Sequence, residues 1–355
     1  IPYLDSISPV AERIGAVNTI VNRAGTLYGY NTDYFGMKAL IARVGIDLAG
    51  KKVLVLGTGG TSRTARVVAA DLGAAEILTV SRRKTEDYIT YEEAVTVHTD
   101  AQVIINTTPA GMYPNCDEKP IDIRFFPNLE WVIDAVYNPL RTNLVLDAQQ
   151  RGIKAEGGLY MLVMQAVVAV ERFLDVSIAK ETADRVFASI YASKENIVLT
   201  GMPGSGKSTV GRLLDADGFT FVDTDAEVEK KCGCSIRKLI ADKGEACFRD
   251  LETAVLREVC AVSGRIIATG GGSILREENV RCLRQNGKLF FLNAEPSRLQ
   301  ATESRPLSDT EEKLKRLYAE RMPIYQKTAD AIVPDLETPQ AEAEYITMKR
   351  KDLIL

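Results

Sequence analysis

The sequence predicts an α/β protein with two parallel sheets, and two glycine-rich turns are the main reason. One turn covers residues 57–62 and the other covers residues 201–208, and each lies between a strand-like apolar run and a helix-like run. A chain of 355 residues is long enough for two or three domains, and a hydrophobic content of 46% is enough for packed cores. We therefore expect one α/β domain around each turn.

The composition excludes several classes of protein. A net charge of −4 without a dense basic cluster argues against a nucleic-acid partner. No apolar run approaches the roughly 18 residues that a membrane span needs, so we expect no membrane partner. The six scattered cysteines are interpreted as reduced thiols of a cytoplasmic enzyme. The chain opens at Ile1 without a methionine, which indicates a piece of something longer.

Strands that alternate with helices predict the first domain. Residues 51–56 have the pattern of a buried strand, residues 63–70 that of the helix after the turn, and further strands are expected at 76–80, 102–105 and 131–136. This alternation is typical of a parallel sheet covered on both faces. After it, apolar spacing predicts two helices between residues 157 and 192.

The turn at residues 57–62 resembles a dinucleotide-binding pattern in which Ser62 stands at the usual third glycine. Alone this pattern is weak, but the next strand ends in Ser81-Arg82-Arg83-Lys84, where an NAD-binding unit usually has an acidic residue. Cationic side chains at this position suit the 2′-phosphate of NADP. The alternative interpretation is that residues 82–84 are a solvated run of charges that binds no cofactor. The predicted NADP contacts are Gly57, Gly59, Gly60, Ser81, Arg82, Arg83, Asn106 and Thr107.

Residues 201–208 form a complete phosphate-binding loop between a strand at 197–199 and a helix at 209–214. Glycines let backbone N–H groups surround phosphates, Lys207 reaches the β- and γ-phosphates, and Ser208 can hold Mg²⁺. The loop predicts binding of ATP or GTP. The predicted nucleotide contacts here are Gly201, Gly204, Ser205, Gly206, Lys207, Ser208 and Thr209.

Four further features follow the loop. Asp223 and Asp225 are expected on one side of an extended strand end, with Asp225 as a helix N-cap in the alternative interpretation. Arg249 and Glu252 share a helix face, in the alternative as an ordinary surface pair. Three glycines at residues 270–272 let a ligand approach the backbone, although they also suit a plain loop. Two motifs that begin at Arg305 and Arg321 flank a charged segment that could close over the nucleotide as a lid.

The first 190 residues resemble shikimate dehydrogenases through five ordered motifs, at residues 15–19, 29–33, 57–62, 106–112 and 157–166. The resemblance implies a Rossmann-type NADP-binding domain at residues 34–156. It also implies a remnant of a substrate domain at residues 1–33 and 157–192.

This resemblance assigns roles to four residues. It places Asp33 with a lysine at the site of hydride transfer, and Asn18, Gln165 and Tyr137 at the substrate. A Lys/Asp pair can relay a proton as a carbonyl accepts hydride. Read alone, Asn18 suits a turn and Gln165 suits the polar side of a helix. The family's lysine and its paired serines would precede Ile1, so we expect this half to bind NADP better than it turns over substrate.

Residues from about 194 to 340 resemble shikimate kinases, which implies a P-loop α/β domain with a parallel sheet at residues 193–355. By this resemblance Lys207 stabilises the transferred phosphoryl group, Ser208 and Asp223 hold Mg²⁺, and Asp225 orients or deprotonates the 3-hydroxyl of shikimate. The remaining implied contacts are Arg249 and Arg321 to the shikimate carboxylate, Gly271 and Gly272 to the acceptor, and Arg305 to ATP. The lid is short, and Lys313 is its first basic residue after Arg305.

The two resemblances imply activities that share one metabolite, shikimate, which is the product of the first and the substrate of the second. We interpret the chain as a bifunctional shikimate-pathway enzyme that reduces 3-dehydroshikimate with NADPH and phosphorylates shikimate with MgATP. The alternative is an active shikimate kinase whose dehydrogenase remnant is a non-catalytic nucleotide-binding or assembly module. Weaker alternatives are a different small-molecule kinase, and a dehydrogenase that takes quinate with NAD. The sequence leaves a homo-oligomer open.

Overall fold

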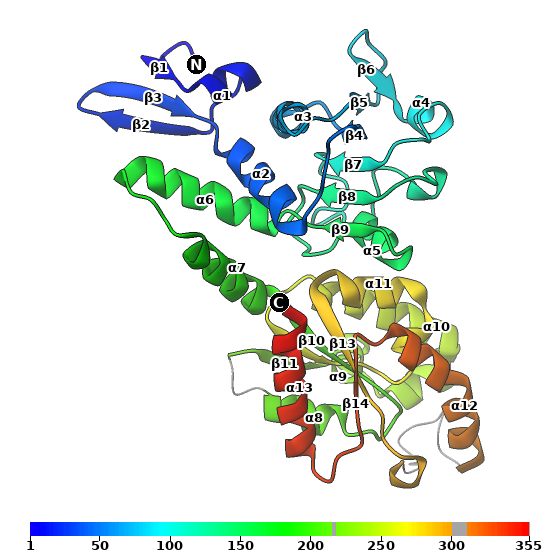
Figure 1. The fold of residues 1–355 in the computed structure, drawn as a ribbon. Helices are drawn as coiled ribbons and strands as arrows, with labels where there is room; N and C mark the ends of the chain where they lie inside the picture. The colour runs from blue at the N-terminus through cyan, green and yellow to red at the C-terminus, as the bar shows by residue number, and fades with distance from the viewer. Residues whose placement is uncertain (215–217, 300–310, 355) are drawn as a thin grey trace. The chain divides into compact units, whose positions relative to one another are not determined.

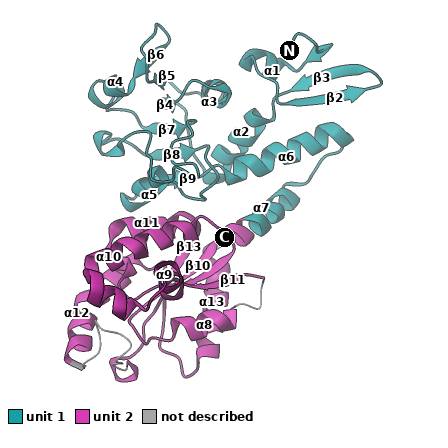
Figure 2. Ribbon diagram, turned by 180° about the vertical axis from the view of Figure 1, so that it is seen from behind, with its two compact units in different colours: residues 1–190 teal, residues 191–355 magenta. Residues whose placement is uncertain are grey.

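The computed structural model describes residues 1–214, 218–299 and 311–354 (Figure 1). The chain divides into two compact units, residues 1–190 and residues 191–355, which Figure 2 shows in teal and magenta. Within the described ranges, no helix combines the length and the apolar character that crossing a membrane requires.

The first unit begins with a small sheet. Strand β3 (Thr26–Tyr30) pairs antiparallel with β2 (Thr19–Arg23) and parallel with β1 (Ser6–Ile7), and helix α1 (Pro9–Ile14) connects β1 to β2. Helix α2 (Thr32–Val44) starts directly after β3, because the side chain of Asn31 accepts a hydrogen bond from the Tyr34 N–H at 3.1 Å. This cap fixes the first turn of α2 at the end of β3.

Helices α2 and α6 (Leu159–Leu174) pack against each other, as both ribbon views show (Figures 1 and 2). Gly36 permits their close approach, since a Cβ there would lie 2.5 Å from the Met161 carbonyl oxygen. Helix α7 (Lys180–Lys194) follows α6 in sequence. The two helices predicted between residues 157 and 192 are therefore present.

The second sheet of this unit has six parallel strands in the order β6-β5-β4-β7-β8-β9. Counted along the chain, this is the 3-2-1-4-5-6 order of a Rossmann fold, whose ligands bind where the order reverses, between β4 and β7. Its elements are β4 (Lys52–Leu56), α3 (Gly60–Asp71), β5 (Glu76–Ser81), β6 (Tyr88–Thr90), α4 (Tyr91–Thr96), β7 (Val103–Asn106), a 3₁₀ turn (Ile123–Phe125), β8 (Trp131–Asp134), α5 (Asn143–Gln150) and β9 (Lys154–Glu156).

The second unit is built on five parallel strands in the order β11-β12-β10-β13-β14. Two buried apolar clusters, one that includes Val198 and one that includes Leu199, cover the two faces of its central strand. Its strands and helices are β10 (Asn196–Thr200), α8 (Lys207–Leu213), β11 (Thr220–Asp223), α9 (Thr224–Cys232), α10 (Ile236–Cys260), β12 (Arg265–Ala268), α11 (Glu277–Asn286), β13 (Gly287–Leu292), α12 (Glu311–Thr328), β14 (Ala331–Val333) and α13 (Pro339–Ile354), with 3₁₀ turns at Ser273–Leu275 and Pro296–Arg298.

Helix α10 is broken at Gly244, whose φ of 85° and ψ of 164° are not helical. The break changes the direction of the chain, so residues of both halves, Ile240 before it and Phe248 after it, line one cavity. Glycine suits this position because side-chain-bearing residues rarely adopt a positive φ.

Candidate functional site

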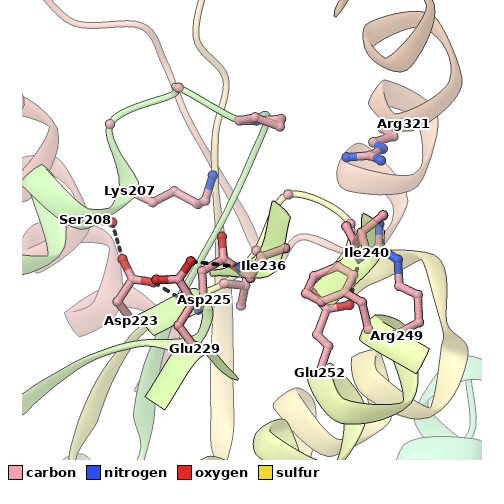
Figure 3. A pocket seen from close by; sticks show the side chains of 18 of the residues that line it. Lys207, Ser208, Asp223, Asp225, Glu229, Ile236, Ile240, Arg249, Glu252 and Arg321 are labelled. Carbon is pink, nitrogen blue, oxygen red and sulfur yellow. Dashed lines mark hydrogen bonds and ion pairs between the residues drawn. The ribbon is translucent and has the colours of Figure 1, made fainter. Parts of the chain in front are cut away.

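A cavity of about 470 Å³ lies at the carboxyl ends of β10, β11 and β12 in the second unit. In open parallel sheets this edge is where ligands bind. The predicted site residues that line the cavity are Gly204, Gly206, Lys207, Ser208, Thr209, Asp223, Asp225, Arg249, Gly271, Gly272 and Arg321. Figure 3 shows Lys207 and Arg321 reaching the cavity from opposite sides.

The phosphate loop is organised around the ammonium group of Lys207. Its Nζ donates hydrogen bonds to the carbonyl oxygens of Gly201 and Met202, each at 2.9 Å. Within the loop, the hydroxyl of Ser205 is buried and has no hydrogen-bond partner in the described part of the chain. Glycines at 204 and 206 have positive φ, which orients backbone N–H groups around the start of α8. A glycine-rich loop that leads into a helix N-terminus in this way is suited to bind phosphate groups.

The hydroxyl of Ser208 donates to the Asp223 carboxylate at 2.6 Å. No group of three or more His, Cys, Asp or Glu side chains arranged to hold a metal occurs among the described residues. A hydroxyl and one carboxylate nevertheless fit Mg²⁺, which is usually held by one or two protein ligands together with phosphate oxygens and water. Ser208 and Asp223 are the residues that could hold it.

The expected geometry of the aspartate pair is wrong. Strand β11 ends at Asp223, and Asp225 lies in the first turn of α9 rather than on an extended strand. The N-cap is Asp223, whose carboxylate accepts from the Asp225 N–H at 3.0 Å and the Ala226 N–H at 3.4 Å, so the alternative with Asp225 as the cap is also wrong. The cap turns the chain into a helix at once, and both carboxylates still line the cavity.

Burial, together with the nearby carboxylates of Asp223 and Glu252, raises the pKa of Asp225 to about 6, and Lys207 and Arg249 oppose the shift. Gly270 allows this crowding, since a Cβ there would lie 2.5 Å from the Asp225 carboxylate and 2.8 Å from that of Glu252. A carboxyl group with this pKa can accept a proton near neutral pH.

The guanidinium of Arg249 is held in place at the cavity wall. It donates to Glu252 at 2.8 Å and to Glu245 at 3.1 Å, and its side chain is 10% exposed. Glu252 is itself fixed by the Ser273 hydroxyl at 2.6 Å. The Arg249–Glu252 pair is therefore a buried ion pair, and its interpretation as a surface pair is wrong. A Cβ at Gly272 would lie 2.4 Å from the guanidinium, so glycine makes room for it.

Residues that the sequence analysis did not single out as site residues also line the cavity. Glu229, Ile236 and Ile240 come from α9 and the first half of α10, and Phe248 comes from its second half. The carboxylate of Glu229 accepts a hydrogen bond from the Ile236 N–H at 3.0 Å, which joins the two helices. No local signal marked them, because they reach the cavity through the packing of α9 and of the two halves of α10. The predicted contact Arg305 lies outside the described residues.

In the first unit, Asn18 and Asp33 meet at the small sheet. The Asn18 amide donates to the Asp33 carboxylate at 2.9 Å, and its carbonyl oxygen accepts from the Thr32 N–H at 2.9 Å. Burial raises the pKa of Asp33, and the hydrogen bond from Asn18 opposes the shift. Gln165 on α6 lies against Gly36, one turn of α2 after Asp33. Tyr137 is 41% exposed in the segment after β8.

The predicted NADP contacts surround the switch point of the Rossmann sheet. Gly57 follows β4 with a φ of 104°, and a Cβ there would lie 3.0 Å from the Thr107 hydroxyl, so the turn and the end of β7 are adjacent. Gly59 and Gly60 are exposed at the start of α3, with open space where a Cβ would be. Arg82 and Arg83 are exposed after β5, where Ser81 accepts from the Arg83 N–H at 3.2 Å.

Asn106 differs from the other predicted NADP contacts described above because its side chain is completely buried. Its amide donates to Asp134 at 2.9 Å and its carbonyl oxygen accepts from the Thr108 hydroxyl at 2.7 Å. Burial raises the pKa of Asp134, and although hydrogen bonds from Thr142, Val136 and Asn106 partly offset the shift, the resulting pKa is about 6. In this structure the Asn106 side chain joins β7 to β8.

Comparison with known proteins gives a different match for each part of the chain. The family model described as shikimate kinase matches residues 203–350. The shikimate kinase of Chromohalobacter salexigens is 40% identical over 166 residues, which cover 44% of this chain and 92% of that protein.

The other part of the chain is similar to dehydrogenases. The NADP⁺-dependent shikimate dehydrogenase of Clostridium perfringens (strain SM101) is 36% identical over 197 residues, which cover 53% of this chain and 72% of that protein. The crystal structure of a chorismate mutase/shikimate 5-dehydrogenase fusion protein from Clostridium acetobutylicum is 33% identical, with a TM-score of 0.52, and the match covers 54% of this chain and 72% of that one.

Proposed function

Because this chain belongs to the shikimate dehydrogenase family through its N-terminal part and to the shikimate kinase family through its C-terminal part, we propose that it is a bifunctional shikimate-pathway enzyme. One reaction reduces 3-dehydroshikimate to shikimate with NADPH. The other transfers the γ-phosphoryl group of ATP to shikimate and yields shikimate 3-phosphate. Shikimate, the product of the first reaction, is the acceptor of the second.

The cavity of the second unit carries the kinase half of this proposal. It brings together a phosphate loop, a carboxyl group that accepts a proton near pH 6 and two buried guanidinium groups. Phosphoryl transfer depends on positioning and on charge stabilisation. Lys207 stabilises the transferred group, Asp225 receives the proton of the acceptor hydroxyl, and Arg249 and Arg321 bind the acceptor carboxylate. Ser208 and Asp223 would hold Mg²⁺, which would supply charge neutralisation at the phosphates.

The pair Asn18–Asp33 and the Rossmann turn support the dehydrogenase half. Asn18 fixes the Asp33 carboxylate at 2.9 Å, and the raised pKa of Asp33 suits a group that exchanges a proton with a substrate oxygen. The exposed Arg82 and Arg83 provide cations for the 2′-phosphate of NADP(H) at the end of β5.

Two assays on the same preparation test the proposal. Shikimate-dependent release of ADP from MgATP reports the kinase, and shikimate-dependent reduction of NADP⁺ at alkaline pH without ATP reports the dehydrogenase. We expect both activities, with Asp225→Asn abolishing only the first and Asp33→Asn only the second. ADP release without NADP⁺ reduction, from folded protein that binds NADP⁺, would instead support a kinase with a non-catalytic dehydrogenase module.

A further inference from the structure

Tyr325 is buried at the point where the phosphate loop meets the loop at residues 270–272, here called the acceptor loop. It lies on α12 one turn after Arg321, and its ring is stacked on Phe291 with ring centroids 4.9 Å apart. Its hydroxyl is within hydrogen-bond distance of the Gly201 carbonyl oxygen, at 2.9 Å, and of the Gly271 carbonyl oxygen. Gly201 belongs to the phosphate loop and Gly271 lines the acceptor side of the cavity.

The two loops also touch directly beside this hydroxyl. A Cβ at Gly271 would lie 2.8 Å from the ring of Pro203 in the phosphate loop. A displacement of one loop therefore displaces the other, because protein interiors are close-packed and transmit small movements.

A phenol has one proton, so the Tyr325 hydroxyl donates fully to only one of the two carbonyl groups at a time. Burial raises the pKa of Tyr325, so the proton stays on the hydroxyl at neutral pH. The carbonyl groups of Gly201 and Gly271 differ in their exposure. Gly201 is buried and Gly271 is half-buried beside the cavity, so only Gly271 has access to a solvent or ligand donor in place of the tyrosine.

Lys207 links the nucleotide to the carbonyl group that receives the hydrogen bond of Tyr325. In this structure its ammonium group also donates to the Gly201 carbonyl oxygen, at 2.9 Å. When Lys207 turns to the phosphates of ATP, that buried carbonyl loses a donor, and the tyrosine proton becomes its replacement. The carbonyl of Gly271 is then released and can accept a hydrogen bond from a hydroxyl of the acceptor.

We propose that Tyr325 is a positioning residue that couples nucleotide binding to acceptor binding by transferring its single hydrogen bond from Gly271 to Gly201. This inference rests on the proposed kinase function. It predicts that MgATP strengthens the binding of the acceptor and, by thermodynamic reciprocity, that the acceptor strengthens the binding of MgATP.

The test compares the KM for shikimate at MgATP concentrations well below and well above the KM for MgATP. ADP release is the readout, so shikimate bound by the N-terminal unit does not enter the result. For the unmodified chain we expect the KM for shikimate to fall about fivefold or more at high MgATP, the lower end of typical coupling. For Tyr325→Phe, which keeps the ring and its stacking, we expect the two KM values to agree within about twofold.

Phe291→Leu is the matched control, because it removes the stacking ring but keeps the tyrosine hydroxyl. We expect it to lower the unfolding temperature and to retain the change in KM. Equal coupling in Tyr325→Phe and the unmodified chain would overturn the inference, as would loss of coupling in Phe291→Leu to the same extent. No phosphorylation of shikimate by the unmodified, folded chain would instead overturn the proposed function.

Discussion

At the scale of single residues, Asp225 shows how the fold sets a charge state. Its carboxyl group lines the cavity beside Asp223 and Glu252, and burial together with these neighbours raises its pKa to about 6. Lys207 and Arg249 oppose the shift, so the carboxylate is still the main form at pH 7. This balance leaves a base that is ionised at neutral pH yet accepts a proton more readily than an exposed aspartate does.

The pKa of Asp225 leads to a prediction for the pH dependence of the kinase. In the proposed mechanism the ionised carboxylate accepts the hydroxyl proton, so we expect activity above about pH 6 and its loss as the pH falls through that value. We expect log kcat for ADP release to decline by about one unit per pH unit below that point. A rate that stays constant down to pH 4.5 would contradict the role of Asp225.

Arg249 gives a second prediction, which concerns the acceptor carboxylate. Lysine keeps the charge but lacks the planar fork that binds a carboxylate with two hydrogen bonds and also contacts Glu252. We expect Arg249→Lys to raise the KM for shikimate by about tenfold or more, the equivalent of one charge-assisted hydrogen bond, with a small change in the KM for MgATP. Arg281→Lys, which alters an i,i+4 pair with Glu277 away from the cavity, is the control and should leave both KM values unchanged.

At the scale of elements, close helix contacts and helix ends place the site residues. The alternation of strands and helices in the sequence predicted the parallel sheets, and the structure confirms them. The pattern did not reveal that α9 begins immediately after β11 or that Gly244 breaks α10. Each feature depends on one residue rather than on a repeating pattern of apolar positions. The start of α9 depends on the cap Asp223, and the break in α10 depends on Gly244.

The contact between α2 and α6 leads to a prediction about stability. A methyl group at position 36 would lie 2.5 Å from the Met161 carbonyl oxygen, so Gly36→Ala forces the two helices apart. We expect a loss of about 1–3 kcal/mol in the free energy of unfolding of the N-terminal unit, the usual cost of overpacking. Urea denaturation followed by circular dichroism measures it.

Gly60→Ala is the matched control for this substitution. Gly60 is also in a helix, but a Cβ there meets no atom within 4 Å, so stability should be unchanged or slightly increased. An equal loss in both variants would show that the contact with Met161 is not the cause.

At the scale of the whole molecule, the chain consists of two compact units, residues 1–190 and residues 191–355, each with its own extended parallel sheet. Because each predicted nucleotide site lies within one unit, a ligand should stabilise only the unit that binds it. We expect NADP⁺ to protect the N-terminal unit from limited proteolysis and MgADP to protect the C-terminal unit. Protection of both units by either ligand alone would contradict this assignment.

Mass spectrometry of the fragments identifies which unit survives. Arg82→Glu, which reverses a charge at the end of β5, should remove the protection by NADP⁺ and leave that by MgADP intact. Lys207→Met should have the opposite effect. These reciprocal variants distinguish two independent sites from a single shared one.

The fold class and the family resemblance of each part could be predicted from the amino-acid sequence, because glycine-rich turns and the motifs around them have a chemical reason that is visible in short runs of residues. The contacts between residues far apart in the chain were visible only in the folded molecule. The hydroxyl of Tyr325 and the carbonyl of Gly201 are separated by 124 positions, and the burial that shifts the pKa of Asp225 comes from several elements at once. Such contacts depend on packing in three dimensions, which no local pattern of residues specifies.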